Sequence, residues 1–210
     1  MTTSSTPCTT SPLKIDYFDF HTISTKLPRE WRLGLTELPG CQRSGYTRCL
    51  NTDLATIQTH SFSHVIILLQ KRELSKYNVH NLLSSYESIN ITPFLFEIED
   101  GHPPSTHQLK EITSLIFTFN PNPNLNLNRN SNIKPLLHCQ GGLGRTGVVV
   151  AALVLVLGEG RFSVDESIAK VREVRGPRAV QTVKQFKFLV ELNKNQEFSR
   201  FLWNLIHDLL

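Results

Sequence analysis

The sequence predicts an α/β fold, a mainly parallel central sheet flanked by helices, on three observations. Short aliphatic runs alternate along the chain with segments whose apolar residues recur at helical spacing. The run at residues 65–69 is continuously aliphatic, which is typical of a parallel strand buried on both faces. The alternation continues up to a glycine-rich turn after residue 137. Together these features favour a parallel sheet covered by helices.

The 210 residues suffice for one domain with a sizeable core. Residues 1–27 are rich in Ser and Thr, and we expect them to be disordered. The folded domain is expected at residues 28–194, interrupted by an Asn-rich surface loop at 120–134. Residues 195–210 carry an apolar stripe at helical spacing, which predicts an amphipathic C-terminal helix that docks on the domain.

The first half of the domain reads as alternating strands and helices. A first strand is expected where apolar and polar residues alternate, at residues 31–35, and Pro39-Gly40 ends it with a turn. The next helix has Asn51 or Asp53 as its N-cap. Helices are then predicted at residues 51–60, 78–88 and 105–119, and strands at 65–69 and 94–98.

In the second half, a strand at residues 135–137 leads into the glycine-rich turn, and residues 148–157 are apolar enough for a buried helix. Residues 163–166 form a capping box that opens a helix ending near Gly176. A further helix is expected at 180–193, with Val183 and Phe186 among the residues that face inward.

The turn combines a nucleophile with an anion cradle. Five residues separate Cys139 from Arg145, and Gly141, Gly142 and Gly144 tolerate the positive φ that lets backbone N–H groups point inward. The start of the following helix adds partial positive charge, and the Arg145 guanidinium can bind two phosphate oxygens. This field favours the thiolate of Cys139. The glycines do not form a nucleotide-binding P-loop, because no Gly-Lys-Ser/Thr follows them. The alternative is a buried structural cysteine in a packing turn.

These residues resemble a known family. His138-Cys139 and Arg145-Thr146 match the signature of cysteine-dependent protein tyrosine and dual-specificity phosphatases. Further stretches are similar to the cyclin-dependent-kinase-associated phosphatase (cyclin-dependent kinase inhibitor 3 type) group: residues 34–41, 72–77, 81–83 and 181–185. The resemblance implies a compact dual-specificity phosphatase fold and phosphothreonine of a kinase activation segment as substrate. The chain departs from the group at Gln140, at Gly147-Val148, in the Asn-rich loop and in the C-terminal helix, which leaves the partner kinase open.

The resemblance also assigns roles to the site. The phosphate-binding residues are expected to be Gln140, Gly141, Gly142, Leu143, Gly144 and Arg145. Asp100 follows a strand and precedes Gly101, so we predict that it is the general acid; Glu97 and Glu99 compete for this role. Thr146 would hydrogen-bond the leaving thiolate, or is a plain residue of the first helical turn. His138 is expected to orient the loop through a ring hydrogen bond. No metal and no cofactor is required.

The expected function is hydrolysis of phosphothreonine, phosphoserine and phosphotyrosine through a cysteinyl-phosphate, with a phosphorylated protein, a cyclin-dependent-type kinase, as partner. Two alternatives stand beside it. One is a non-catalytic protein that binds phosphothreonine or a kinase. The other is a lipid or polyphosphate phosphatase, although such enzymes often place a Lys within the loop and residues 140–144 contain none.

Composition and charge indicate which partners and which cellular compartment to expect. The net charge of +4 suits an anionic substrate but, without a run of Lys and Arg, predicts no nucleic-acid binding. The four cysteines form no CxxC pair, which predicts a reduced intracellular protein, cytoplasmic and also nuclear. The longest apolar run, residues 148–157, is too short to span a bilayer. Nothing in the sequence indicates the oligomeric state.

Overall fold

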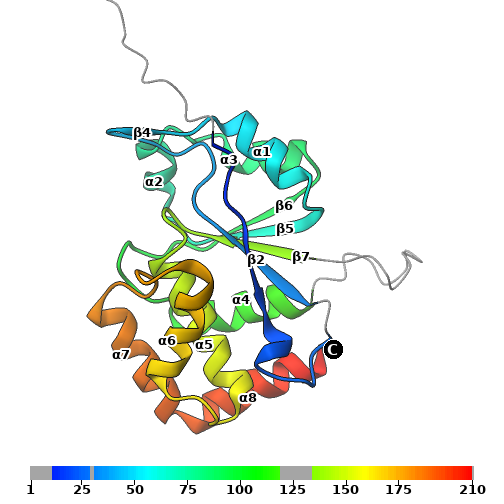
Figure 1. Ribbon diagram of the computed structural model, residues 1–210, viewed down its shortest axis with the longest axis vertical. Coiled ribbons are helices and arrows are strands. Elements are labelled where there is room, and N and C mark those ends of the chain that lie inside the picture. The colour runs from blue at the N-terminus through cyan, green and yellow to red at the C-terminus, as the bar shows by residue number, and fades with distance from the viewer. Residues whose placement is uncertain (1–10, 29–30, 119–133, 210) are drawn as a thin grey trace, which may run out of the picture.

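A five-stranded sheet runs through the middle of the molecule, with helices on both sides (Figure 1). The computed structural model describes residues 11–28, 31–118 and 134–209. The strand order is β1-β2-β7-β5-β6, with β1 antiparallel to β2 and the other three pairings parallel. The strands are β1 (Asp16–Asp19), β2 (Arg32–Thr36), β5 (Phe62–Ile67), β6 (Thr92–Leu95) and β7 (Lys134–His138). The predicted mainly parallel sheet is therefore confirmed.

The helices form two layers with separate apolar clusters (Figure 1). One layer contains α1 (Leu50–Gln58), α2 (Lys71–Lys76) and α3 (Leu82–Ser88). The other contains α4 (Thr106–Thr118), α5 (Gly144–Gly158), α6 (Val164–Arg175), α7 (Val183–Lys194) and α8 (Gln196–Asp208). A short 3-10 helix, η1 (Phe20–Thr22), follows β1, and a two-stranded hairpin, β3 (Gln42–Arg43) and β4 (Tyr46–Thr47), lies outside the main sheet.

The central strand and the central helix meet at the glycine-rich turn. Strand β7 pairs with β2 on one side and β5 on the other, and His138 at its end is in register with Thr36 and Ile67. Helix α5 is buried along its whole length, because its residues are apolar on every side. Cys139 therefore lies at the carboxyl end of a central strand, opposite the N-terminus of a fully buried helix.

The structure differs from the sequence-based expectation at the N-terminal segment. Residues 1–27 were expected to be disordered, but residues 16–19 form β1 at the edge of the sheet. The reason is that Phe18, Phe20, Ile23 and Leu27 are buried in the same cluster as α5. The Ser- and Thr-rich composition concealed these apolar residues. Residues 1–10 lie outside the described part of the chain, as does the Asn-rich loop up to residue 133.

The buried face of helix α7 also differs from the one expected from the sequence. Val183 and Phe186 were expected to face inward, but their exposed fractions are 69% and 39%. Thr182 caps the helix by accepting a hydrogen bond from the Gln185 N–H and also donates one to the Gly101 carbonyl, so the side of the first turn that bears Thr182 and Gln185 faces the protein. The buried residues of α7 are Gln185, Leu189 and Leu192. A polar residue, Gln185, therefore occupies the buried position in the first turn, which apolar periodicity could not predict.

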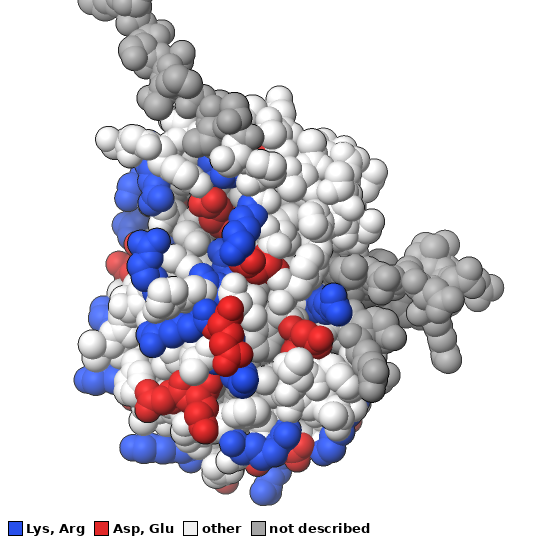
Figure 2. Space-filling model, viewed as in Figure 1, with Lys and Arg blue, Asp and Glu red and all other residues white. Residues whose placement is uncertain are grey.

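The surface carries charges of both signs. Figure 2 shows one face, on which acidic and basic side chains are interspersed over the lower half while the upper right is nearly free of them. The mild net positive charge is therefore not gathered into a single basic patch on this face. None of the helices that the structure describes has the length and apolar character needed to cross a membrane.

Candidate active site

The backbone carbonyls of the turn point outward, away from Cys139. The Gln140 carbonyl accepts a hydrogen bond from the Leu38 N–H (3.0 Å), and the Leu143 carbonyl accepts one from the Val180 N–H (3.3 Å). The Gly142 carbonyl accepts a hydrogen bond from Arg175 Nε (3.0 Å). In a trans peptide the N–H points opposite to the C=O of the same unit. The N–H groups of residues 141, 143 and 144 are therefore turned inward, toward a common point that suits an anion.

Gly142 is the residue at which the turn most needs glycine. Its φ is +65°, in the region that favours residues without a Cβ. A Cβ at this position would also collide with the backbone carbonyl oxygen of Thr36 and with the Arg175 guanidinium. The turn is thus packed directly against strand β2 and the end of α6. Any larger residue would displace the outward carbonyl of Gly142 and the N–H opposite to it.

Arg145 is held in place by a buried carboxylate. Its Nη1 and Nη2 donate hydrogen bonds to the two carboxylate oxygens of Glu73 at 2.6 and 2.9 Å, and Nη1 also donates to the Ile98 carbonyl at 3.0 Å. The side chains of Arg145 and Glu73 are 1% and 8% exposed. Glu73 is itself fixed, because one of its carboxylate oxygens accepts a hydrogen bond from the Gln70 N–H at the start of α2.

This arrangement keeps Arg145 both charged and available. Burial alone lowers the pKa of Arg145, but the hydrogen bonds that it donates to Glu73, together with the electrostatic influence of Cys139, Glu73 and Asp100, outweigh burial, so the pKa lies above its usual value. Among the described residues, Arg145 Nε has no hydrogen-bond partner although it is buried. An unpaired buried donor is costly, and a phosphate oxygen would satisfy it. The guanidinium is oriented by Glu73 on one edge and open on another.

Of the three candidate acids, only Asp100 reaches this group. Asp100 Oδ1 lies 3.2 Å from Arg145 Nη2, while the side chain stays 74% exposed. Glu97 Oε2 accepts a hydrogen bond from the Lys71 N–H (3.2 Å), and Glu99 lies 3.6 Å from His102. The geometry therefore separates Asp100, beside the anion site, from two carboxylates that pair with surface residues.

The loop that carries Asp100 is tethered to the start of α7. Thr182 Oγ1 donates a hydrogen bond to the Gly101 carbonyl at 2.6 Å, and Gly101 has a φ of +75°. Lys184 Nζ lies 2.6 Å from His102 Nε2 on the same loop. The residues 181–185, which resemble the phosphatase group in sequence, thus contact the loop of the candidate acid.

His138 lies beneath the turn and is fully buried. Its Nδ1 lies 3.3 Å from the Cys139 carbonyl, and its Nε2 lies 3.0 Å from the Tyr86 hydroxyl. A carbonyl can only accept, so Nδ1 carries the proton and Nε2 accepts from Tyr86. Burial lowers the pKa of His138 to about 4, which keeps the ring neutral. Both ring nitrogens are occupied, so the ring supports the loop and has no free position to act as a base.

Two further polar groups at the site lack partners within the described residues. Thr146 Oγ1 is buried in the first turn of α5, and Gln185 Nε2 is buried at the start of α7. A Cβ added to Gly144 would lie 2.6 Å from Gln181 Oε1 and 3.1 Å from Gln185 Nε2, so both amides pack against the turn. These groups are available to a thiolate, a bound oxyanion or water.

Several supporting residues were not assigned a role from sequence. Glu73 lies within a stretch that resembled the phosphatase group, but its partner is 72 positions away in the chain. Tyr86 lies within the helix expected at residues 78–88, and Arg175 directly precedes Gly176, near which another helix was expected to end, but neither was given a role. The one signal in the sequence was the position of Glu73 within residues 72–77, a stretch that resembles the phosphatase group. Among the described residues, no group of three or more His, Cys, Asp or Glu is arranged to hold a metal ion.

Comparison with known proteins agrees with this geometry. The family described as Cyclin-dependent kinase inhibitor 3 (CDKN3) matches residues 8–168. The cyclin-dependent kinase inhibitor 3 of Rattus norvegicus is 36% identical over 159 residues, which cover 76% of this chain and 70% of that protein. The protein of the same name from Homo sapiens is 34% identical over the same length, with the same coverage.

A solved structure is similar over nearly the whole chain. It is the kinase associated phosphatase (KAP) with its catalytic-site cysteine replaced by serine, and it has a TM-score of 0.78 at 29% sequence identity. The similarity covers 90% of this chain and 98% of that one. The agreement therefore extends beyond the glycine-rich turn to the arrangement of the sheet and helices.

The role of Glu73 predicts a loss of activity on Glu73→Gln. The amide keeps one acceptor oxygen but turns an NH₂ toward the guanidinium, so Arg145 loses its fixed orientation. We expect kcat/KM for a small phosphate ester to fall by about 10- to 100-fold, because small displacements of a substrate-positioning group have effects of this size. Glu99→Gln, which removes an exposed carboxylate of the same type, is the control. Equal activity of the two variants would contradict the positioning role.

The buried His138 predicts that stability depends on pH. Its pKa is about 4 in the folded protein against 6.5 as the ordinary value, so the unfolded chain binds more protons between these limits. This contribution is present above pH 6.5 and is lost as pH falls toward 4. Urea unfolding of the wild type and of His138→Gln at several pH values between 7 and 4 tests this. The stability difference between them should shrink as pH falls; a constant difference would argue against a neutral buried ring.

Proposed function

Because the chain belongs to the cyclin-dependent kinase inhibitor 3 family, we propose that it is a cysteine-dependent dual-specificity protein phosphatase that acts on a phosphorylated kinase. The observation that supports the proposal is that the turn after Cys139 has N–H groups directed inward, and that the guanidinium of Arg145 at its end is oriented by Glu73. Asp100 lies beside this point, 3.2 Å from Arg145. In this proposal Cys139 is the nucleophile, the turn and Arg145 are the anion cradle, and Asp100 is the acid.

In the first step the Cys139 thiolate attacks phosphorus and the bond to the substrate oxygen breaks. The departing alkoxide takes a proton from Asp100. Proton transfer from a positioned acid typically raises the rate of such a step by about 10²–10⁴-fold. The equatorial phosphate oxygens gain negative charge, which the inward N–H groups and Arg145 Nε stabilise. The products are the free hydroxyl side chain and a cysteinyl-phosphate.

In the second step water attacks the cysteinyl-phosphate and the sulfur–phosphorus bond breaks. Asp100, now a carboxylate, accepts the proton of the attacking water. The sulfur leaves as a thiolate, to which the unpartnered Thr146 hydroxyl can donate a hydrogen bond. Gln181 and Gln185 pack against Gly144 of the turn and are the amides beside this step. Inorganic phosphate is released and the site returns to its starting state.

The two alternatives have less support. A protein that only binds phosphothreonine gains nothing from a carboxylate beside the anion site, because Asp100 would repel the phosphate. A phosphatase for highly charged lipids or polyphosphates would benefit from a basic residue in the turn, and residues 140–144 contain none. The candidate acid and the neutral turn both favour a protein phosphomonoester as substrate.

Kinase recognition is the finer part of the proposal. Helix α7 exposes Val183 and Phe186 directly after Thr182, which contacts the loop of the candidate acid. Exposed apolar side chains beside an active site suit contact with a folded partner. A protein acting on a cyclin-dependent-type kinase would work in the cytoplasm or nucleus, and we propose these compartments.

The chemistry predicts distinct defects for two substitutions. Cys139→Ser should abolish hydrolysis of a small aryl phosphate while inorganic phosphate still binds, because the cradle consists of backbone and Arg145. Asp100→Asn should lower kcat by about 10²–10⁴-fold. Steady-state kinetics and calorimetric phosphate binding provide the measurements, with Cys49→Ser and Glu99→Gln as controls. Turnover by Cys139→Ser within tenfold of wild type would exclude Cys139 as the nucleophile.

Partner docking predicts a preference for folded substrate. An intact cyclin-dependent kinase phosphorylated on its activation segment should be dephosphorylated with a much higher kcat/KM than a peptide copied from that segment, since a second contact surface adds binding energy. The control is p-nitrophenyl phosphate, on which a Val183→Ser/Phe186→Ser double variant should keep wild-type activity. The same variant should lose part of the preference for the kinase. Equal kcat/KM for kinase and peptide would disprove docking but leave the phosphatase chemistry intact.

A further inference from the structure

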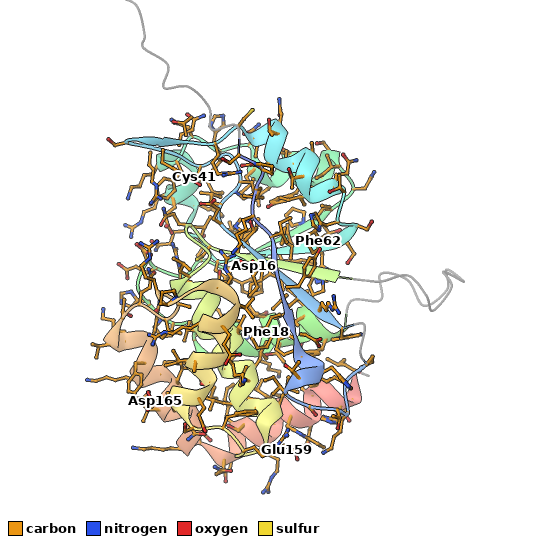
Figure 3. The ribbon with its side chains drawn as sticks, in the orientation of Figure 1. Asp16, Phe18, Cys41, Phe62, Glu159 and Asp165 are labelled. Carbon is orange, nitrogen blue, oxygen red and sulfur yellow. The ribbon has the colours of Figure 1, made fainter. Side chains whose placement is uncertain are left out.

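The edge strand β1 is connected to the phosphate-binding turn through one arginine. Asp16 Oδ2 lies 2.5 Å from Arg175 Nη1, and the two side chains are 16% and 6% exposed. Arg175 Nε donates a hydrogen bond to the Gly142 carbonyl at 3.0 Å, and Nη1 also reaches the Leu35 carbonyl at 3.4 Å. In Figure 3 Asp16 lies near the middle of the molecule, above Phe18 of the same strand.

The planarity of the guanidinium makes this contact directional. Nε and Nη1 belong to one rigid group, so a carboxylate that fixes Nη1 also fixes the direction in which Nε points. Arg175 is nearly buried, and removing the partner of a buried charge is costly. Without Asp16, the guanidinium would turn toward water or another acceptor. Its hydrogen bond to Gly142 would then weaken.

Loss of the hydrogen bond between Arg175 and the Gly142 carbonyl would alter the part of the turn that binds the anion. Its carbonyl must point outward for the Leu143 N–H, in the same peptide unit, to point inward. Gly142 adopts a positive φ, and because glycine has no Cβ it can adopt more backbone conformations than any other residue could at this position. An external hydrogen bond is therefore needed to select the conformation that binds an anion, and Arg175 supplies it.

We propose that Asp16 is a positioning residue for phosphate binding, acting through Arg175 on the peptide between Gly142 and Leu143. The strand β1 is thus more than an edge of the sheet: it contributes a charge that keeps the turn in its binding conformation. This inference rests on the proposed function only in that phosphate is the anion bound. It assigns a role in the site to a segment that lies about 120 residues before Cys139 in the chain.

The experiment compares Asp16→Asn with two controls in the full-length protein. Lys14→Met removes the other partner of Asp16, an exposed Lys 3.0 Å away, and leaves the contact with Arg175. Asp19→Asn removes the same charge from the same strand, but Asp19 only caps η1. For each variant we would measure thermal unfolding, kcat and KM for p-nitrophenyl phosphate, and the dissociation constant of inorganic phosphate by calorimetry. All assays would run well below the lowest unfolding temperature.

The expected result for Asp16→Asn is about a tenfold weaker affinity for phosphate and a lower kcat, since a misplaced binding group affects both. Lys14→Met and Asp19→Asn should bind phosphate as the wild type does. If Asp16→Asn lowers only the unfolding temperature and keeps wild-type phosphate affinity, the contact is structural and the proposal is wrong. Should the wild type bind phosphate without hydrolysing the ester, the proposed function fails, while the effect of Asp16 on phosphate affinity still decides this inference.

Discussion

The ion pair between Glu73 and Arg145 is the interaction on which the site depends. Arg145 lies in the first turn of the fully buried helix α5 on one side of the sheet, and Glu73 comes from α2 in the opposite layer. The pair therefore joins the two helical layers at the carboxyl end of β7. Breaking a buried pair of this kind typically costs about 3–5 kcal/mol, because the remaining charge has no water to replace its partner. Stability and orientation of the anion-binding group thus have the same physical origin.

The turn itself could not hold its conformation alone. Its outward carbonyls are bonded by donors from four parts of the chain: Leu38 after β2, His138 at the end of β7, Arg175 at the end of α6, and Val180 before α7. Each of these bonds leaves an N–H pointing inward, so the cradle is formed before any ligand arrives. Preorganised dipoles of this kind need no rearrangement during the reaction, which is the main way in which a protein stabilises developing charge. A dual-specificity phosphatase fold provides all four donors at one edge of a mainly parallel sheet.

Most of the candidate site could be inferred from the sequence, and the features that the sequence did not predict have specific physical causes. The candidate nucleophile Cys139, the glycines and Arg145 lie within one short segment, so their order alone was enough to predict the chemistry. Asp100 was preferred over its neighbours Glu97 and Glu99 from the sequence, and in the fold Asp100 lies 3.2 Å from Arg145 whereas Glu97 accepts a hydrogen bond from the Lys71 N–H. Strand β1 was missed because its buried Phe18 and the following Phe20 lie within a segment that was assigned from its Ser and Thr content.

Local sequence patterns were sufficient to predict the strand, turn and helix around Cys139. They were also sufficient to predict the alternation of strands and helices that implies a parallel sheet, because both features depend on residues close together in the chain. The strand order β1-β2-β7-β5-β6 was decided only in the tertiary structure, and with it the partners of Arg145 and Arg175. Those partners, Glu73 and Asp16, are 72 and 159 positions away. Their side chains are ordinary surface types in the sequence, and they acquire a role because folding removes water from around two guanidinium groups and leaves a carboxylate as the available counter-charge.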